Sequence, residues 1–530
     1  MFYSLVKYEY KHNYRSSQYY SSIETPDYLT QKLIFVNIKS NNNSKKGVVM
    51  FYLYFFLFIG IILGSYFICK YALKLDNNKF KSTMSKILKI SVVVYCSITL
   101  ITILLPNALT LSYDQDILNT MPINRGIVIL NWLSCMTFVI LPIAVFFKNR
   151  IIRNIAIYFC TIVTLLQICF YSEFIKIFTA TNGRGLNSVS IIGDGFKSFL
   201  INKTFRSFII GIIWSLELMI PIILAVEEKH IFNVKNLKEW LYTFLILALT
   251  FISATPIYAP QHLFGYTNII FDAWTLPHIV WLILVISEII TIYFIFRNKD
   301  VEIKRIMLFI LSLSLLMQYN QMFGAISLSI KRLPMQLCNI GSYLILIALI
   351  TKSKKIFDFT IIVNVVGVLF ALALPDLDGE GIFYLYNMHF VLEHTNVLVI
   401  PILALTLKLF PKLDKHSLKT FFFGFLIYYL SVFMLGTIFN GIAVATDNSF
   451  WSANYLFMFD QEVATEFIPF FGKLFNPIIK LGIFQIYPVI QIIVYLVFNV
   501  ICFATFGTIQ LIYLLKDKFT KNKQLKNNNH

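Results

Sequence analysis

The feature that most constrains this chain is a series of apolar runs of about 20 residues, most of them bounded by lysine or arginine. At 1.5 Å per residue, a helix of this length crosses the hydrocarbon core of a bilayer. Only 14% of the 530 residues are charged, too few to cover the surface of a soluble protein of this size. The sequence therefore predicts an all-α, polytopic transmembrane helix bundle.

The apolar runs predict about thirteen spans, and the charges between them predict an orientation. The seven segments after odd-numbered spans hold 25 lysines and arginines, whereas the six after even-numbered spans hold 10. We therefore predict a multi-pass protein of the cell membrane whose C-terminus is cytoplasmic and whose first span starts outside. The expected spans are 48–73, 87–111, 126–147, 151–171, 206–226, 239–258, 274–296, 304–325, 334–351, 356–375, 388–410, 418–440 and 485–515.

The two ends of the chain are polar. Residues 516–530 form a basic tail that we expect on the cytoplasmic side. Residues 1–47 carry seven lysines and arginines against three acids, which conflicts with a location outside the membrane. One explanation is that translation starts at Met50, directly before an apolar run, so that residues 1–47 are not made. A peptide from residues 1–40, detected by mass spectrometry in native cells, would exclude this explanation.

The net charge of +18 does not predict a nucleic-acid partner. The basic residues lie in short clusters between apolar runs, where membrane topology accounts for them. The seven cysteines are scattered singly, with no CxxC pair and no spacing typical of metal ligands. We therefore expect no metal site and no cofactor.

Two pairs of segments indicate an internal repeat. Pro122 and Pro334 lie in the first pair, "TMPINRGIVILNWLSCMTFVILPIAVFFKNR" and "RLPMQLCNIGSYLILIALITKSKK". Pro221 and Pro401 lie in the second pair, "SLELMIPIILAV" and "TNVLVIPILALTL". The pairs predict a degenerate tandem repeat of a six-span unit.

The repeat divides the chain into a first six-span membrane unit, 48–265, and a second seven-span unit, 270–515. The alignment places Gly126 opposite Cys338 and Trp214 opposite His394. The residues that suggest chemistry therefore belong to the second unit only.

The second unit places polar side chains at one depth, near the outer ends of several spans. Cys338 lies four residues inside its span, at a depth of about 6 Å. Polar and ionisable residues inside spans usually face the bundle interior and mark a site. The candidate site residues are His278, Tyr319, Asn320, Gln336, Cys338, Asn339, His389, Glu393 and His394.

These residue types suit nucleophilic chemistry. A cysteine reacts as the thiolate, so Cys338 needs a base, for which His394 or His389 is available. Glu393 follows His389 by one helical turn and can orient that ring. Asn339 or Gln336 can donate a hydrogen bond to a developing oxyanion. At headgroup depth, the natural acyl source is an ester of a membrane glycerolipid.

The same residues also permit a packing role. A single cysteine in a membrane helix is most simply a small buried hydrophobe. Gln336 and Asn339 can be interhelical hydrogen bonds, which are common in membrane bundles. His389, at the start of a span, can be an interface residue.

The second unit resembles a known family over about 270–515. "RLPMQLCNIGSYL", "LPDLDGEGIFYLYNMHFVLEHTNVLVIPI", the outer His278, and "NYLFMF" with a later "YP" resemble the YwaF-like bacterial integral membrane proteins. That family is remotely similar to a eukaryotic transmembrane acyltransferase family that acts on ether phospholipids and uses a cysteine. The resemblance implies that Cys338 corresponds to this cysteine and that His394, before Pro401, corresponds to a histidine on a later span. It implies membrane lipids as the partners.

Three functions remain open from the sequence. The first is a thiol-dependent lipid acyltransferase, the second a transporter or lipid-handling carrier, and the third a membrane scaffold or assembly factor. Few charges lie deep in the other spans, which argues against ion-coupled transport. No protein partner is predicted.

Overall fold

The computed structural model describes residues 59–61, 63–67, 78–105, 107–111, 123–179, 202–228, 237–265, 267–326, 330, 333–373, 375, 381–461 and 469–528. The chain divides into two compact units, Met1–Phe56 and Leu57–His530, and all described residues belong to the second. Within them, nine helices are long and apolar enough to cross a membrane. The expectation of an all-α polytopic membrane protein is confirmed.

Twelve of the thirteen expected spans correspond to helices in the described residues. Nine are the candidate spans, and the sixth, eighth and ninth correspond to α13 (Leu237–Ser253), α16 (Val301–Ile326) and α17 (Leu337–Thr351). Helices α13 and α17 have only 17 and 15 residues. The first expected span lies largely outside the described residues, as do residues 1–47 and Met50.

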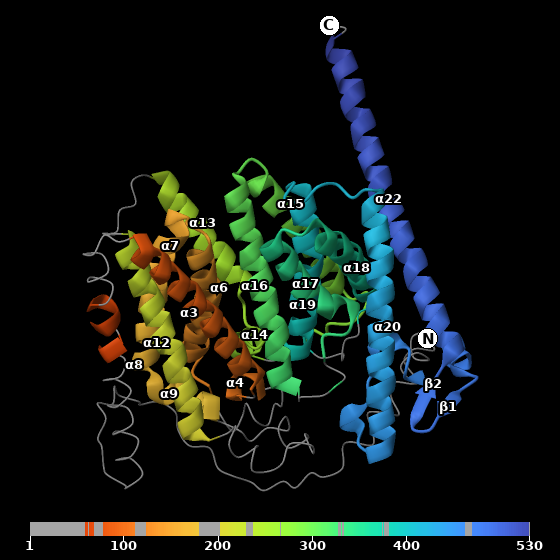
Figure 1. The fold of residues 1–530 in the computed structure, drawn as a ribbon, viewed down its shortest axis with the longest axis horizontal. Coiled ribbons are helices and arrows are strands. Elements are labelled where there is room, and N and C mark those ends of the chain that lie inside the picture. The colour runs from red at the N-terminus through yellow and green to blue at the C-terminus, as the bar shows by residue number, and fades with distance from the viewer. Residues whose placement is uncertain are drawn as a thin grey trace. The chain divides into compact units, whose positions relative to one another are not determined.

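The first half of the described chain is entirely helical (Figure 1). The expected fourth span is not a regular α-helix, because a π-helical segment, η2, interrupts it. Besides α13, the elements are α3 (Asn78–Leu104), α4 (Ala108–Leu111), α6 (Arg125–Phe146), α7 (Arg150–Ile155), η2 (Ala156–Cys160), α8 (Thr161–Cys169), α9 (Tyr171–Thr179), α12 (Lys203–Glu228) and α14 (Ala259–Phe264).

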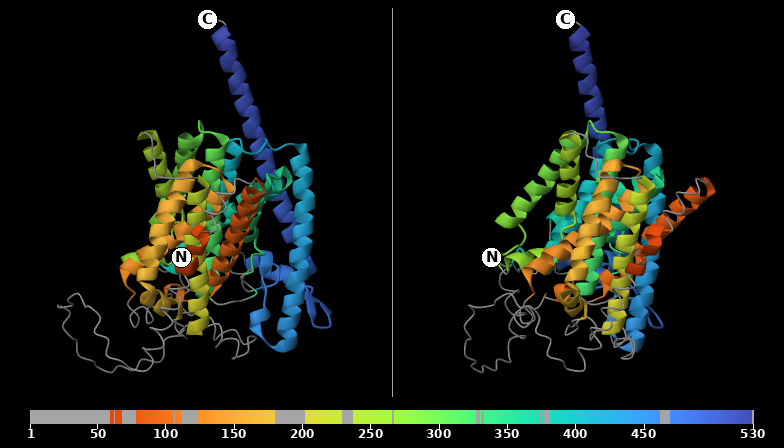
Figure 2. Two further views of the ribbon diagram at one scale, coloured as in Figure 1. Left: turned by 60° about the vertical axis from the view of Figure 1, so that its left-hand side comes forward. Right: turned by 90° about the vertical axis from the view of Figure 1, so that its left-hand side faces the viewer.

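The second half adds a small antiparallel hairpin before its last helix, in which β1 (Ile479–Leu481) pairs with β2 (Phe484–Ile486). Besides α16 and α17, its helices are α15 (Leu276–Phe296), α18 (Lys354–Ala373), α19 (Leu385–Thr406), α20 (Lys415–Thr446) and α22 (Pro488–Asn528), with short 3₁₀ segments η4 (Ser449–Trp451), η5 (Tyr455–Phe457) and η6 (Pro469–Phe475). Helix α22 continues through most of the expected tail 516–530. Its C-terminal part extends beyond the other helices in every view (Figures 1 and 2).

Polar side chains begin several helices. Asn124 accepts a hydrogen bond from the Gly126 amide at the start of α6, and Asn149 caps α7 in the same way. Asp414 and Ser417 form a reciprocal capping box before α20. These contacts satisfy amides that the first turn of a helix leaves unpaired.

Helix α16 joins the two halves. It packs against α3, α4, α6 and α13 on one side and against α17 and α19 on the other (Figure 1). The most enclosed spans are α6 and α19, each with 72% of its apolar window buried, against 22% for α15 and α22. Since α15 and α22 are strongly apolar but mostly uncovered, we infer that they face lipid.

Helix α19 is the centre of the second half, because it packs against α15, α16, α17 and α18. Phe357 of α18 stacks on Phe410, which follows the end of α19, with their ring centroids 4.0 Å apart. The two aligned prolines, Pro221 and Pro401, both lie inside helices, α12 and α19. The tandem repeat and the boundaries at 48–265 and 270–515 stay predictions.

Candidate functional site

Predicted site residues of α16, α17 and α19 meet at one end of these helices. Tyr319 on α16 is a hydrogen-bond partner of Asn339 on α17. Its ring centroid lies 6.1 Å from that of His389 on α19. Asn320 accepts a hydrogen bond of 3.3 Å from the Tyr343 hydroxyl. The structure therefore brings together Tyr319, Asn320, Asn339 and His389.

His389 and Glu393 form a buried pair on α19. His389 Nε2 lies 3.0 Å from Glu393 Oε2, one helical turn away, as their spacing predicts. The remaining polar atom of each, His389 Nδ1 and Glu393 Oε1, is buried without a hydrogen-bond partner in the part of the chain that the structure describes. A carboxylate that orients an imidazole while one ring nitrogen stays free is the arrangement of a general base.

Cys338 lies half-buried in the first turn of α17. Its thiol donates a hydrogen bond of 3.1 Å to Asn339 Oδ1. The Glu393 carboxylate is close enough to act electrostatically on the thiol. Among the described residues, however, no hydrogen bond joins this sulfur to His389 or to His394. The thiol therefore lies near the histidine–glutamate pair without being engaged by it.

His394 lies on a different side of α19 from His389, since five residues correspond to about 140° around a helix. Its Nδ1 lies 2.8 Å from the Phe390 carbonyl, and its ring centroid lies 4.1 Å from that of Phe390. The Phe390 ring in turn contacts Trp281 of α15. Since a carbonyl can only accept, Nδ1 carries the proton and Nε2 of the neutral ring is the acceptor. The structure does not pair His394 with Cys338 by a hydrogen bond, and its catalytic role stays a prediction.

His278 has a clear structural role. It is fully buried, and its Nδ1 accepts a hydrogen bond of 2.9 Å from the Trp274 amide. Its Nε2 lies 3.0 Å from the Leu372 carbonyl, so the ring links the start of α15 to the end of α18. Both ring nitrogens are occupied by backbone groups, and neither is available to a substrate.

Gln336 also acts through backbone contacts. Its Nε2 donates to the Asn454 carbonyl (3.1 Å) and its Oε1 accepts from the Leu456 amide (3.0 Å). The side chain therefore ties the N-terminus of α17 to the loop that contains η5. Both polar groups of Gln336 are therefore occupied. Asn339 Oδ1 accepts from the Cys338 thiol, and a donor role of the Asn339 amide toward an oxyanion stays a prediction.

The polar end of α16 serves two separate sites. Tyr319 and Asn320 face α17 and α19, whereas Gln318 donates to the carbonyls of Ser253 and Thr255 in the first half. Gln321 accepts from the Ile257 amide, also in the first half. Neighbouring residues on a helix point in different directions, so Gln318 and Gln321 contact the first half while Tyr319 and Asn320 contact the second.

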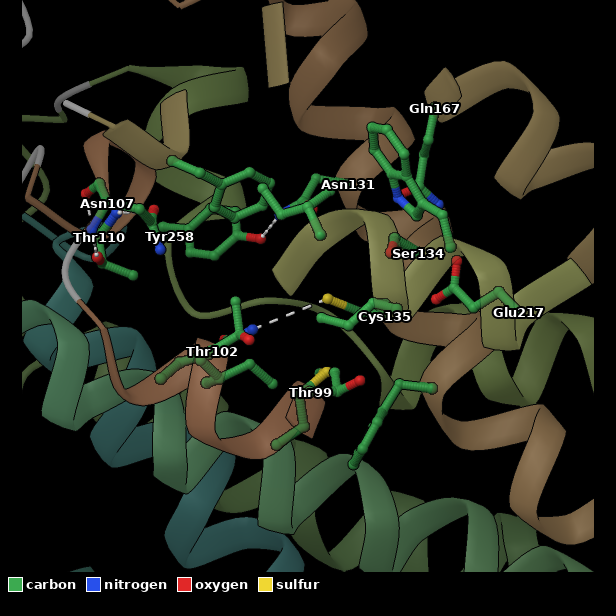
Figure 3. Close-up of a pocket in the computed structure, with 18 residues that line it drawn as sticks. Thr99, Thr102, Asn107, Thr110, Asn131, Ser134, Cys135, Gln167, Glu217 and Tyr258 are labelled. Atoms are coloured by element: carbon green, nitrogen blue, oxygen red, sulfur yellow. Dashed lines mark hydrogen bonds between the residues drawn. The ribbon is translucent and has the colours of Figure 1, made fainter. Parts of the chain in front are cut away.

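Sequence reasoning missed a polar cavity in the first half (Figure 3). The cavity, with about 700 Å³ of empty space including its mouth, is bordered by α3, α6, α8, α9 and α12, by the segment around α14, and by α16. Its polar and aromatic lining includes Thr99, Asn131, Ser134, Cys135, Gln167, Trp214, Glu217, Tyr258 and Gln321. The polar residues are therefore not confined to the second half.

Glu217 is the only acidic residue among the described residues that line this cavity. It is 1% exposed and lies near the middle of α12. Tyr95 of α3 donates to its Oε1 (2.9 Å), and Thr164 Oγ1 of α8 lies 3.0 Å from its Oε2. The signal was present in the sequence: "SLELMIPIILAV" contains a lone acid within an apolar span, which by default marks a functional site.

Comparisons with known proteins bear on the second half only. Residues 270–506 match the TMEM164 family. This is a family of membrane proteins, and the match covers less than half of the chain. A comparison with curated proteins gave no match, and neither did a comparison with solved structures. The similarity and the apolar helices identify a multi-pass membrane protein, whereas the resemblance to YwaF-like proteins and to acyltransferases stays a prediction.

Within the described residues, no group of three or more His, Cys, Asp and Glu side chains lies close enough together to hold a metal ion.

Proposed function

We propose that the second half carries out thiol-dependent acyl transfer between membrane lipids, with Cys338 as the nucleophile. The observation that carries the proposal is the buried His389–Glu393 pair, with one polar atom on each residue lacking a partner among the described residues, on the helix that packs against the half-buried Cys338 of α17. Unpaired polar atoms at a buried site are costly unless a ligand satisfies them. A lipid ester and an acceptor hydroxyl would supply such partners.

The chemistry needs no other co-reactant. The Cys338 thiol gives its proton to a histidine, and the thiolate attacks the ester carbonyl of a glycerolipid. The ester C–O bond breaks, the histidine returns the proton to the departing lysolipid hydroxyl, and the acyl chain remains as a thioester. The hydroxyl of a second lysolipid then loses its proton to the histidine and attacks the thioester, which restores the thiol.

Two histidines compete for the role of base. The family resemblance favours His394, whose Nε2 is the acceptor nitrogen. The geometry favours His389, because Glu393 orients its ring and leaves Nδ1 free. With either histidine as the base, the imidazole must approach the Cys338 sulfur when substrate binds. Catalytic hydrogen bonds are often long without substrate and shorten in the substrate complex.

The direct test is acyl transfer by purified protein in vesicles that contain a phospholipid with a labelled acyl chain and an unlabelled lysolipid. We expect Cys338→Ala to abolish labelling of the lysolipid and Cys502→Ala, a buried thiol on α22, to leave it intact. A hydroxylamine-sensitive acyl label on Cys338 would identify the thioester. Turnover that survives Cys338→Ala would reject the thiol mechanism.

The base is assigned by the matched pair His389→Gln and His394→Gln. Loss of at least about a hundredfold in kcat in one variant, with near-normal turnover in the other, names the base. Equal turnover of both variants and the parent would leave neither histidine with a catalytic role.

We also propose that this cluster faces the outer leaflet of the cell membrane, with a cytoplasmic C-terminus. The excess of lysine and arginine on the opposite side supports this orientation. A C-terminal tag that external protease cleaves on intact cells would overturn it.

A further inference from the structure

We propose that the first-half cavity binds a small ligand carrying an ammonium group, with Glu217 as its counter-charge. The site is separate from Cys338 and independent of acyl transfer. Three features of the described part of the cavity favour such a ligand: a single buried carboxylate, an unused hydrogen-bond donor, and the aromatic rings that line it (Figure 3).

The hydrogen bonds around Glu217 form a complete set when the carboxyl group carries a proton. Thr164 Oγ1 lies 2.9 Å from the Cys160 carbonyl and 3.0 Å from Glu217 Oε2, but a hydroxyl has only one hydrogen. If Thr164 donates to the carbonyl, a protonated Glu217 donates to Thr164 and accepts from Tyr95. The empty cavity therefore suits a neutral glutamic acid, and ionisation would call for a positive charge beside it.

Among the described residues that line the cavity, none is a lysine, arginine or histidine. The residues that face Glu217 are Tyr95 on α3, Cys135 on α6, Cys160 on η2 and Thr164 on α8, all of them uncharged types. A carboxylate near the middle of a span is costly unless it is paired. A cationic ligand would provide the missing partner.

Gln167 shows that the ligand should also carry a hydrogen-bond acceptor. The indole N–H of Trp214 can only donate, so its contact of 2.8 Å must be with Gln167 Oε1. This fixes the orientation of the amide and leaves Gln167 Nε2 as a buried donor with no partner among the described residues. Gln167 is 3% exposed and lines the cavity, so an acceptor on the ligand would complete its contacts.

The remaining lining suits an amine. The rings of Phe138, Trp214 and Tyr258 border the cavity, and aromatic faces attract cations when the site is sheltered from water. An amino alcohol, with an ammonium group next to a hydroxyl, meets all of these requirements. Two sources share this chemistry: the free amino alcohol, and the headgroup of an aminophospholipid, in which a phosphate ester oxygen takes the place of the hydroxyl as the acceptor.

The test uses the full-length protein in nanodiscs of phosphatidylglycerol, titrated with ethanolamine and, separately, with ethylene glycol of similar size and no charge. We expect calorimetric binding of ethanolamine only. Glu217→Gln keeps both hydrogen bonds, because an amide can accept from Tyr95 and donate to Thr164, but it lacks the charge. We expect it to bind at least about tenfold more weakly. The control is Glu288→Gln on α15, which removes an acid that does not line the cavity.

A second variant tests the same cavity independently, in case Glu217→Gln does not fold. Gln167→Leu removes the unused donor while Glu217 stays in place, and it should weaken ethanolamine by a smaller factor than Glu217→Gln. Nanodiscs of phosphatidylethanolamine separate the two ligand sources. If the lipid headgroup is the ligand, these discs abolish binding of added ethanolamine in the parent protein, and if the free amine is the ligand, binding persists. Failure of ethanolamine to bind in phosphatidylglycerol discs, equal binding by Glu217→Gln, or equally tight binding of ethylene glycol would overturn the proposal.

Discussion

Gly341 on α17 lies at a close approach to α18, where it faces Asn364. A Cβ atom at position 341 would overlap Asn364 Oδ1 and lie 2.6 Å from its Cγ. Asn364 cannot easily make room, because it is fully buried and its Nδ2 donates to the Val397 carbonyl of α19 (3.2 Å). The substitution Gly341→Ala therefore strains the contact between three helices directly below Cys338.

The magnitude follows from two opposing effects. Overpacking a well-packed core costs about 1–3 kcal/mol, and displacing Asn364 from the Val397 carbonyl costs about 0.5–1.5 kcal/mol more. Alanine is favoured over glycine inside a helix by about 0.5–1 kcal/mol. We therefore expect Gly341→Ala to destabilise the protein by a net of about 0.5–4 kcal/mol.

The matched control is Gly507→Ala on α22, where nothing lies within 4 Å of the new methyl group. Both substitutions gain the same helix propensity, so the difference between them isolates the steric effect. Thermal unfolding of the purified variants in the same nanodiscs should give a lower midpoint for Gly341→Ala and an unchanged or higher one for Gly507→Ala. The double variant Gly341→Ala, Asn364→Ala should be less destabilised than the sum of its single changes. Equal midpoints for the two glycine variants would refute the reasoning.

Three further predictions follow from the hydrogen bonds of single side chains. Gln336→Ala removes both side-chain contacts to the loop 454–459, so amide hydrogen exchange in that loop should become faster, and unchanged exchange would contradict the assignment. His278→Ala removes the link between α15 and α18 and should lower the thermal midpoint, and an unchanged midpoint would contradict this structural role. The hydrogen bond from the Ser417 amide lowers the pKa of the Asp414 carboxyl below its usual value of 3.8. The ionised Asp414 cap therefore stabilises the fold fully above pH 3.8, and this stabilisation is lost as the pH falls through the folded-state pKa. Exchange of the first α20 amides should therefore rise in acid, and Asp414→Asn should remove this pH dependence.

Much of the fold was predictable because span length and hydropathy are local properties of the sequence. Nine of the expected spans are long apolar helices, and the ends that carry Tyr319, Asn339 and His389 do come together. The His389–Glu393 contact was predictable for the same reason, since residues four apart always share a helix face.

The partners of individual polar groups were not predictable. Depth along a span places His278 level with His389, but only the rotation of each helix decides which neighbour a side chain meets. The structure turns both ring nitrogens of His278 to backbone groups and places Gln318 against the first half, away from Tyr319. Alignment of the two halves also drew attention away from Glu217, which lacks an acidic counterpart in the second half.

The sequence by itself determined that this chain is a bundle of membrane-spanning helices, because a bilayer requires apolar runs of fixed length with satisfied backbone groups. It also determined which helix ends are polar. Only the tertiary structure decided that these polar residues divide between two places: a thiol near a histidine–glutamate pair around Cys338, and a buried carboxylate in the cavity around Glu217. The physical reason is that a side chain's partners depend on helix rotation and on contacts between distant segments, and neither is encoded in the length or hydropathy of a single span.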